Sequence, residues 1–249
     1  MNSNNPFFKN KTFTNTSAAA EVHEAKVIDR NETMTVSGTI NKSFLMLVLL
    51  VASAAVTWSM ENPIVFAIGG AIVGFILVLI ATFKPQYSGF LAPGYAIFEG
   101  LFIGGISAIF EVMYPGIVIQ AVSCTFVTFM VCFGLYKYEI VKVTEKFKSV
   151  VVAATLAIAT YYLFSWLLSM FTSFQPVHYG NSMMSIGISA FVIVIAALNL
   201  FLDFDQIEKG VQQKMPKYME WYSAMGLMIT LVWLYIEFLR LLSKISSRD

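Results

Sequence analysis

The stretch "IVFAIGGAIVGFILVLIATF", residues 64–83, decides the fold class because its twenty residues include no charged side chain. A helix needs about 20 mainly apolar residues to cross the hydrocarbon core of a bilayer. A backbone within that core must also satisfy its own hydrogen bonds, and an α-helix does so. The stretch therefore predicts a transmembrane helix.

Six other apolar runs have a comparable length. The chain has 249 residues, of which 57% are hydrophobic and 12% charged, whereas a soluble domain is typically about 25% charged. We therefore predict an all-α integral membrane protein, a seven-transmembrane helical bundle over residues 43–245 without a soluble domain. The predicted spans are 43–60, 64–83, 90–110, 115–136, 149–172, 183–204 and 221–243.

Residues 1–42 differ from the rest of the chain, because they are polar and rich in Asn, Thr, Lys and Glu. Such a segment buries too little apolar surface to offset the entropy lost on ordering. We expect it to form a disordered cytoplasmic tail.

Basic residues indicate the direction of the spans, because cytoplasmic loops are enriched in Lys and Arg. The tail and every second loop carry them, which predicts a cytoplasmic amino terminus. Arg240, Lys244 and Arg248 lie at the end of the seventh span and break this pattern. Either the carboxyl terminus is an exception, or the last helix is re-entrant or deeply buried; we expect seven full crossings. The thirteen basic residues that fit the pattern are Lys9, Lys11, Lys26, Arg30, Lys42, Lys84, Lys137, Lys142, Lys146, Lys148, Lys209, Lys214 and Lys217.

Glu99 lies near the middle of the third predicted span. A charged side chain at that depth is unfavourable by a few kcal/mol. Its carboxyl is therefore either protonated and bonded to a neighbouring helix, or directed at a wet cavity or a partner. Glu99 is a candidate ion- or proton-sensing residue.

Asp203 and Asp205 lie at the end of the sixth predicted span and point about 200° apart on a helix. Asp205 has Lys209 at i+4, a spacing typical of a surface ion pair. Asp203 has Asn199 at i−4, which suggests a polar line toward the interior of the bundle. The alternative is that both carboxylates lie at the water boundary. Asp203 is the first sensing candidate, and Asp205 ranks third after Glu99.

Glu237 and Arg240 are spaced i, i+3 in the seventh span and are expected to form a structural ion pair. Enzyme chemistry is not indicated. The two histidines, His23 and His178, lie outside the spans, and no metalloprotease, nucleophile-elbow or phosphate-loop motif is present. We expect no enzyme activity and no cofactor, and the net charge of +1 suggests no nucleic-acid partner.

Three segments together resemble the Bax inhibitor-1 (transmembrane Bax inhibitor motif) family over about residues 43–245. They are "YAIFEGLFIGGIS" at 95–107, "LNLFLDFDQIEKG" at 198–210 and "PKYMEWYSAMGLMITLVWLYIEFLRLLSK" at 216–244. The last segment resembles the bacterial YccA-like branch. The resemblance implies a bundle whose last helix is central and which lies in the cell membrane, for the bacterial branch the inner membrane.

The resemblance also implies a pH-sensitive calcium leak channel with a sensing pair of aspartates in the sixth and seventh spans. Two adjacent carboxyls repel each other when both are ionised, which raises the pKa of one of them toward neutrality. Such a pair therefore responds to cellular pH. Asp203 matches the sixth-span aspartate and would be a transient calcium ligand. The seventh-span aspartate falls on Thr230 or on Glu237, depending on the register, and Glu99 is another source of a second carboxylate. The alternative function is a non-conducting regulator that binds a membrane quality-control protease or another stress-response partner.

Overall fold

The computed structural model describes residues 32–172 and 176–248. The chain divides into two units, Met1–Thr33 and Met34–Asp249. Nearly all of the first unit, and with it most of the predicted tail, lies outside the described residues. The second unit contains helices α2 (Val36–Trp58), α3 (Pro63–Phe83), α4 (Ser88–Met113), α5 (Ile117–Lys137), α6 (Glu145–Phe171), α7 (Met183–Gln212) and α8 (Met219–Ser246), with short 3₁₀ turns η3 (Pro85–Tyr87) and η4 (Val177–Tyr179).

Seven helices in the described part are long and apolar enough to cross a membrane, which confirms the predicted all-α bundle. Several of them extend past the apolar runs. α7 continues to Gln212, and α2 already begins at Val36, where the Thr35 side chain caps it by accepting from Gly38 N at 3.0 Å. Residues 36–42 are therefore helical, and the predicted tail boundary at 42 lies too late. Helical hydrogen bonds need no apolar side chains at the membrane surface, so hydropathy does not reveal these turns.

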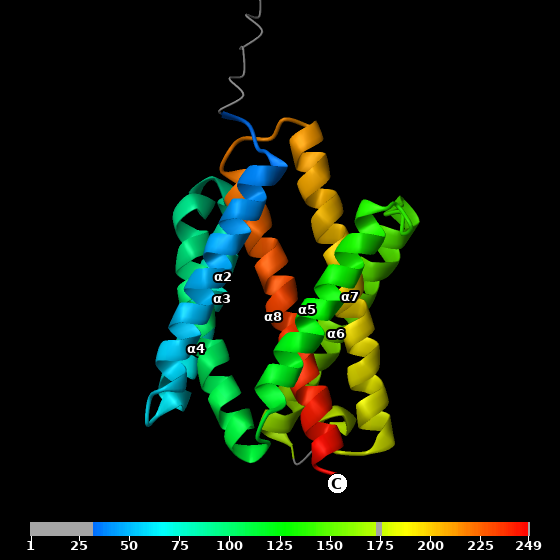
Figure 1. Ribbon diagram of the computed structural model, residues 1–249. Helices are drawn as coiled ribbons and strands as arrows, with labels where there is room; N and C mark the ends of the chain where they lie inside the picture. Colours follow the sequence, from blue (N-terminus) through cyan, green and yellow to red (C-terminus); the bar gives the residue numbers. More distant parts are fainter. Residues whose placement is uncertain (1–31, 173–175, 249) are drawn as a thin grey trace, which may run out of the picture. The chain divides into compact units, whose positions relative to one another are not determined.

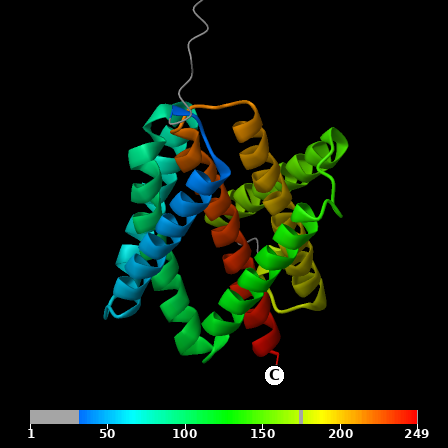
Figure 2. The ribbon, with the colours of Figure 1, turned by 45° about the horizontal axis from the view of Figure 1, so that its top comes forward.

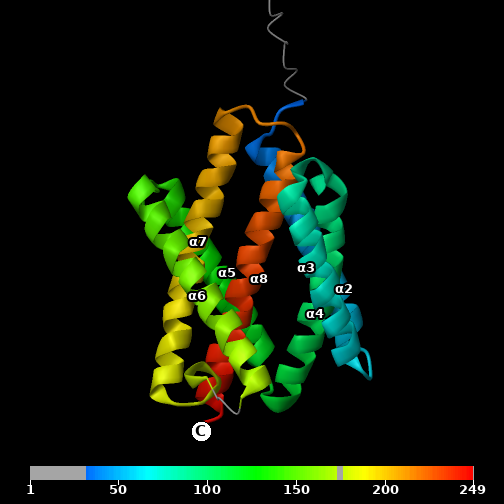
Figure 3. The ribbon, with the colours of Figure 1, turned by 180° about the vertical axis from the view of Figure 1, so that it is seen from behind.

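α8 lies between two groups of helices, with α2, α3 and α4 on one side and α5, α6 and α7 on the other (Figures 1 and 3). It packs against α2, α4, α5 and α7. Half of the most apolar 18-residue stretch of α8 is buried inside the bundle, a larger share than in any other span. The last helix is thus the central element, which the tilted view also shows (Figure 2).

The turns of this unit gather at two ends. The start of α2 and the α3–α4, α5–α6 and α7–α8 connections lie at one end, which we call the basic end because the lysines of these loops belong to it (Figure 1). The carboxyl terminus lies at the opposite, far end (Figure 1). α8 therefore runs the full length of the bundle and is not re-entrant.

Glycines allow α4 to approach α2 and α3 closely. A methyl group placed on Gly70 of α3 would lie 2.9 Å from the backbone nitrogen of Phe102, and one placed on Gly104 of α4 would lie 2.7 Å from Cα of Ala54. Helices in a bilayer associate largely through such close packing, since lipid provides no hydrophobic drive between them. α2, α3 and α4 consequently form one tightly packed group.

Candidate functional site

Asp203 lies on the wall of a pocket near the basic end. The pocket has a volume of about 130 Å³ and is formed by the end of α3, the second half of α7 and the first half of α8. This volume exceeds the share of a single water molecule, which is about 30 Å³. The lining residues are Val78, Thr82, Asp203, Gln206, Tyr222, Ser223, Met225, Gly226 and Ile229.

Two polar atoms of this pocket are buried without a hydrogen-bond partner among the described residues, Oδ2 of Asp203 and Oγ of Ser223. An unmade hydrogen bond of a buried group is unfavourable by about 1–3 kcal/mol, and more when the group is charged. Because Thr82, Gln206 and Tyr222 line the same space, waters or a hydrated cation there would find several oxygen ligands. The pocket is therefore the strongest candidate for a polar site in the described part of the bundle.

The neighbour of Asp203 on α8 is Thr230. The Thr230 hydroxyl is close enough to interact with the Asp203 carboxylate, and it also reaches the Gly226 carbonyl at 3.4 Å. A methyl group placed on Gly226 would lie 3.9 Å from Asp203 Oδ1, so the aspartate faces bare backbone of α8. Of the two residues that the sequence offers as partners of Asp203 on α8, Thr230 is the one that lies beside it. The neighbour of Asp203 on α8 is thus a hydroxyl and not a second carboxylate.

Glu99 is not among the residues that line the Asp203 pocket. Its carboxylate lies against α3, where a methyl group placed on Gly74 would be 3.0 Å from Glu99 Oε2. α4 packs mainly on α2, α3 and α8, whereas α7 packs mainly on α8, α5 and α6. The sequence could not reveal this separation, because it does not state which helices are neighbours.

Asp205 lies in an ion-pair network at the basic end. It contacts Lys209 at 3.0 Å, as the i, i+4 spacing predicts, and Lys148 at the start of α6 at 2.9 Å. Asn199 donates to Thr155 Oγ1 on α6 at 2.8 Å and does not extend a polar line from Asp203. Asp205 and Asn199 therefore attach α7 to α6, while Asp203 faces α8.

Glu237 and Arg240 form their ion pair near the far end, with 3.2 Å between Arg240 Nη1 and Glu237 Oε1. The Glu237 side chain is 1% exposed, and the Tyr162 hydroxyl of α6 donates to the same oxygen at 3.4 Å. The Arg240 guanidinium lies 5.5 Å from the centroid of the Tyr162 ring. This geometry is that of a structural cluster joining α8 to α6, as the i, i+3 spacing suggests.

Lys244 and His178 extend this far-end cluster. Lys244 donates to Ser189 Oγ at 2.7 Å and to the Ser185 carbonyl at 3.3 Å, both on α7. His178, in the α6–α7 connection, is 7% exposed and lies 3.1 Å from the Tyr161 hydroxyl. Burial, aided by the nearby charges of Arg240 and Lys244, lowers the pKa of His178 below its ordinary value of 6.5. The basic residues at the end of the seventh span are thus partly used inside the bundle, which explains their departure from the loop pattern.

Glu220, in the first turn of α8, is a residue that the sequence does not single out. It is fully buried, and its Oε1 accepts from the backbone nitrogen and the hydroxyl of Thr35, each at 2.9 Å. Its other oxygen pairs with Lys42 of α2, whose ammonium also lies 5.4 Å from the Trp221 ring. The sequence does not reveal this role, because the hydrogen-bond partners of Glu220 are 178 to 185 positions away in the chain.

No cluster of three or more His, Cys, Asp or Glu side chains that could hold a metal ion occurs within residues 32–172 and 176–248. A calcium ion takes roughly six to eight oxygen ligands. Asp203 with neutral oxygens and waters would therefore hold it only transiently.

Comparison with known proteins agrees with this architecture. The family model described as "Bax inhibitor 1 like" matches residues 5–247 of the chain. The match begins well before residue 43, so it includes most of the segment that the sequence resemblance left out. No curated protein matches the chain. From the extent of the family match, we conclude that this seven-helix membrane protein belongs to the Bax inhibitor 1 like family.

Proposed function

We propose that the protein is a pH-sensitive cation leak pathway of the cell membrane, with Asp203 as its titrating residue and calcium as a permeant ion. The observation that carries the proposal is the buried Oδ2 of Asp203, which faces a polar pocket without a hydrogen-bond partner among the described residues. An ionised Asp203 attracts a cation into the pocket, and protonation removes that attraction. From the distribution of basic residues, we propose that the basic end faces the cytoplasm. In a bacterium, this is the cytoplasmic side of the inner membrane.

A cation reaches Asp203 from the basic end in this proposal. Thr82 at the end of α3 and Tyr222 and Ser223 at the start of α8 provide oxygen atoms along the way. Farther along α8, Val232 and Leu234 are buried in the apolar core. Conduction therefore requires α8 to shift relative to its neighbours, and the described conformation corresponds to a closed state.

Thr230 gives this pathway a simpler proton sensor than a pair of carboxylates. Two coupled carboxyls share protons and titrate in two steps that belong to the pair. With Thr230 opposite, Asp203 titrates as a single group. We therefore expect the pH dependence of flux to follow one proton.

Calcium flux into proteoliposomes across a range of pH tests the proposal. We expect flux to rise with pH as Asp203 ionises, and Asp203→Asn to abolish both the flux and its pH dependence. Glu61→Gln in the exposed α2–α3 turn is the matched control, because it makes the same change of carboxylate to amide away from the pocket. Unchanged flux and pH dependence in Asp203→Asn would contradict the assignment.

A regulator that binds a membrane quality-control protease is the alternative. The hydroxyl of Thr230 beside Asp203 favours it, because this pair lacks the second titrating group of a two-carboxylate sensor. Crosslinking in native membranes followed by purification distinguishes the two functions. Absence of ion flux from the folded protein, together with recovery of a crosslinked protease, would select the regulator.

A further inference from the structure

The Asp203 pocket contains a single side chain that carries a full charge. Of the nine residues that line the pocket, only Asp203 is an Asp, Glu, Lys or Arg. When Asp203 is ionised, the pocket therefore has one negative charge and no basic side chain to balance it.

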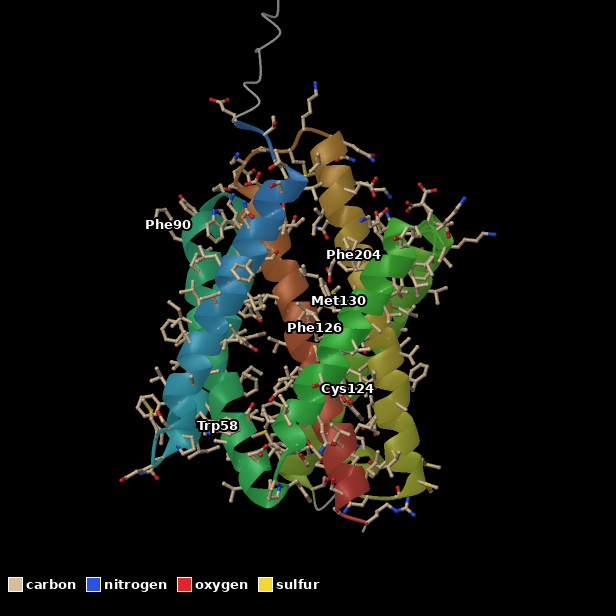
Figure 4. The ribbon with its side chains drawn as sticks, viewed as in Figure 1. Trp58, Phe90, Cys124, Phe126, Met130 and Phe204 are labelled. Atoms are coloured by element: carbon tan, nitrogen blue, oxygen red, sulfur yellow. The ribbon has the colours of Figure 1, made fainter. Side chains whose placement is uncertain are left out.

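The pocket is separate from the face of the bundle between α2 and α5. Phe204, the residue after Asp203, lies between α7 and α5 (Figure 4), and its ring centroid is 5.6 Å from that of Phe133 and 5.8 Å from that of Phe129. Successive residues of a helix point about 100° apart, and Asp203 is turned toward α3 and α8. The charged residues of the α5–α6 connection consequently do not line the pocket.

The other carboxylates in the basic-end halves of α7 and α8 have partners of their own. Asp205 contacts two lysines at 2.9 Å and 3.0 Å, and Glu220 pairs with Lys42. Glu208 accepts from the Tyr136 hydroxyl of α5 at 2.5 Å and so points away from the pocket. A cation in the pocket is therefore balanced by the Asp203 carboxylate alone.

Four neutral side chains add oxygen atoms to the pocket. The hydroxyl of Ser223 is buried without a hydrogen-bond partner among the described residues. Thr82 donates its hydroxyl proton to the Val78 carbonyl at 2.9 Å, which leaves the lone pairs of its oxygen free. Gln206 and Tyr222 provide an amide and a phenol oxygen. The volume of about 130 Å³ equals roughly four water molecules at about 30 Å³ each, so a bound cation keeps part of its hydration shell.

This set of ligands matches a cation of one positive charge. A monovalent cation beside ionised Asp203 gives a neutral pocket, whereas calcium leaves one positive charge away from bulk water, which is unfavourable. Calcium sites obtain their affinity from the number of charged ligands, while neutral oxygens hold monovalent cations in membrane proteins. We propose that the pocket binds a monovalent alkali cation, Na⁺ or K⁺, in preference to calcium. The assignment rests on the proposed role of Asp203 as the residue that attracts cations, and it makes calcium the more weakly held permeant ion.

Direct binding of radioactive sodium and calcium to the purified full chain tests this preference. Binding is measured by scintillation proximity at alkaline pH, so that Asp203 is ionised, with choline chloride keeping the ionic strength constant. The difference between wild type and Asp203→Asn defines binding in the pocket. We expect this binding for sodium, with displacement by potassium, and displacement by calcium only at about tenfold higher concentration. The more effective of sodium and potassium identifies the preferred ion.

Variants test the charge argument. Gln206→Glu places a second carboxylate in the pocket and should reverse the preference, so that calcium displaces sodium at about tenfold lower concentration than sodium displaces calcium. Gln213→Glu, just past the end of α7, is the matched control and should keep the order of the wild type, since Gln213 is exposed and does not line the pocket. Thr82→Val removes a neutral oxygen and should weaken sodium binding about fivefold. Because Gln206 and Thr82 are exposed, we expect both variants to fold.

Three results would overturn the proposal. Tighter binding of calcium than of sodium and potassium in the wild type would contradict the preference, and an unchanged order in Gln206→Glu would contradict its cause. Equal sodium binding in wild type and Asp203→Asn would mean that the pocket holds water alone.

Calcium flux measured in parallel separates this proposal from the proposed function. Sodium binding that depends on Asp203, without any flux, would keep the monovalent site and remove the leak pathway. Calcium flux that depends on Asp203, together with tighter binding of calcium, would keep the pathway and remove the monovalent preference.

Discussion

The carboxylate of Glu220 at the start of α8 fills the space beside Gly38 at the start of α2. In a capping box, the residue three positions after the N-cap bonds back to the N-cap backbone nitrogen. Here the N-cap is Thr35 and the third position is Gly38, which has no side chain. Glu220 makes the missing bond from another helix, at 2.9 Å from the Thr35 nitrogen. The first turn of α2 is thus completed by α8.

Gly38→Ala should destabilise the protein because the new methyl group would overlap the Glu220 carboxylate. Overpacking of this kind typically reduces the free energy of unfolding by about 1–3 kcal/mol. Gly69→Ala is the control, since nothing lies within 4 Å of a methyl group there. Unfolding in detergent measures both, and equal stability of the two variants would contradict the contact.

Lys42→Met should be more damaging, because it leaves the fully buried Glu220 carboxylate without its main countercharge. Removal of one partner of a buried ion pair reduces stability by about 3–5 kcal/mol. Adding Glu220→Gln to Lys42→Met should restore much of that loss, which a double-mutant cycle of unfolding free energies would measure. Lys217→Gln should have little effect, since this lysine is 48% exposed and 3.8 Å from Glu220.

Thr230→Asp should convert the single-carboxylate site into a coupled pair, because Thr230 faces Asp203 across the α7–α8 contact. Two carboxyls this close share a proton and titrate in two steps. We expect the pH dependence of calcium flux to broaden and its midpoint to move toward neutral pH. Thr230→Asn, which adds a similar side chain without a charge, should keep a pH dependence of flux that follows one proton. The same pH dependence in both variants would contradict the placement of Thr230 opposite Asp203.

His178 should make the far end sensitive to acid. Its folded-state pKa is below 6.5 because it is buried near Arg240 and Lys244, so the neutral form stabilises the fold. This stabilisation is fully present above pH 6.5 and is lost as the pH falls through the lower folded-state pKa. Thermal unfolding of wild type and His178→Asn between pH 7.5 and about 5 should show a smaller loss of stability in the variant. Parallel curves would mean that His178 is not responsible.

The sequence predicts those features that depend on local spacing. Each apolar run had to form a helix to cross the bilayer, so all seven spans were found. The pairs Asp205–Lys209 and Glu237–Arg240 follow from neighbouring turns of one helix. A single sequence therefore contains the spans and the pairs within a helix.

Contacts between distant helices were beyond the sequence. Glu99 faces Gly74, and Asp203 faces Thr230. These contacts depend on which helices are neighbours and on how each helix is rotated about its axis. The spacing of residues along one helix reveals neither its neighbours nor its rotation. The role of Glu220 was missed for the same reason, since its partners belong to the opposite end of the chain.

The central place of α8 has a consequence for biogenesis. Translation delivers α8 after the four helices that it packs against, α2, α4, α5 and α7, so these helices enter the membrane before their central partner is present. α8 also contains Glu220, Glu237, Arg240 and Lys244, charges that make insertion of an isolated helix unfavourable. A nascent chain stalled before Met219 would therefore lack the helix that packs against both groups of helices.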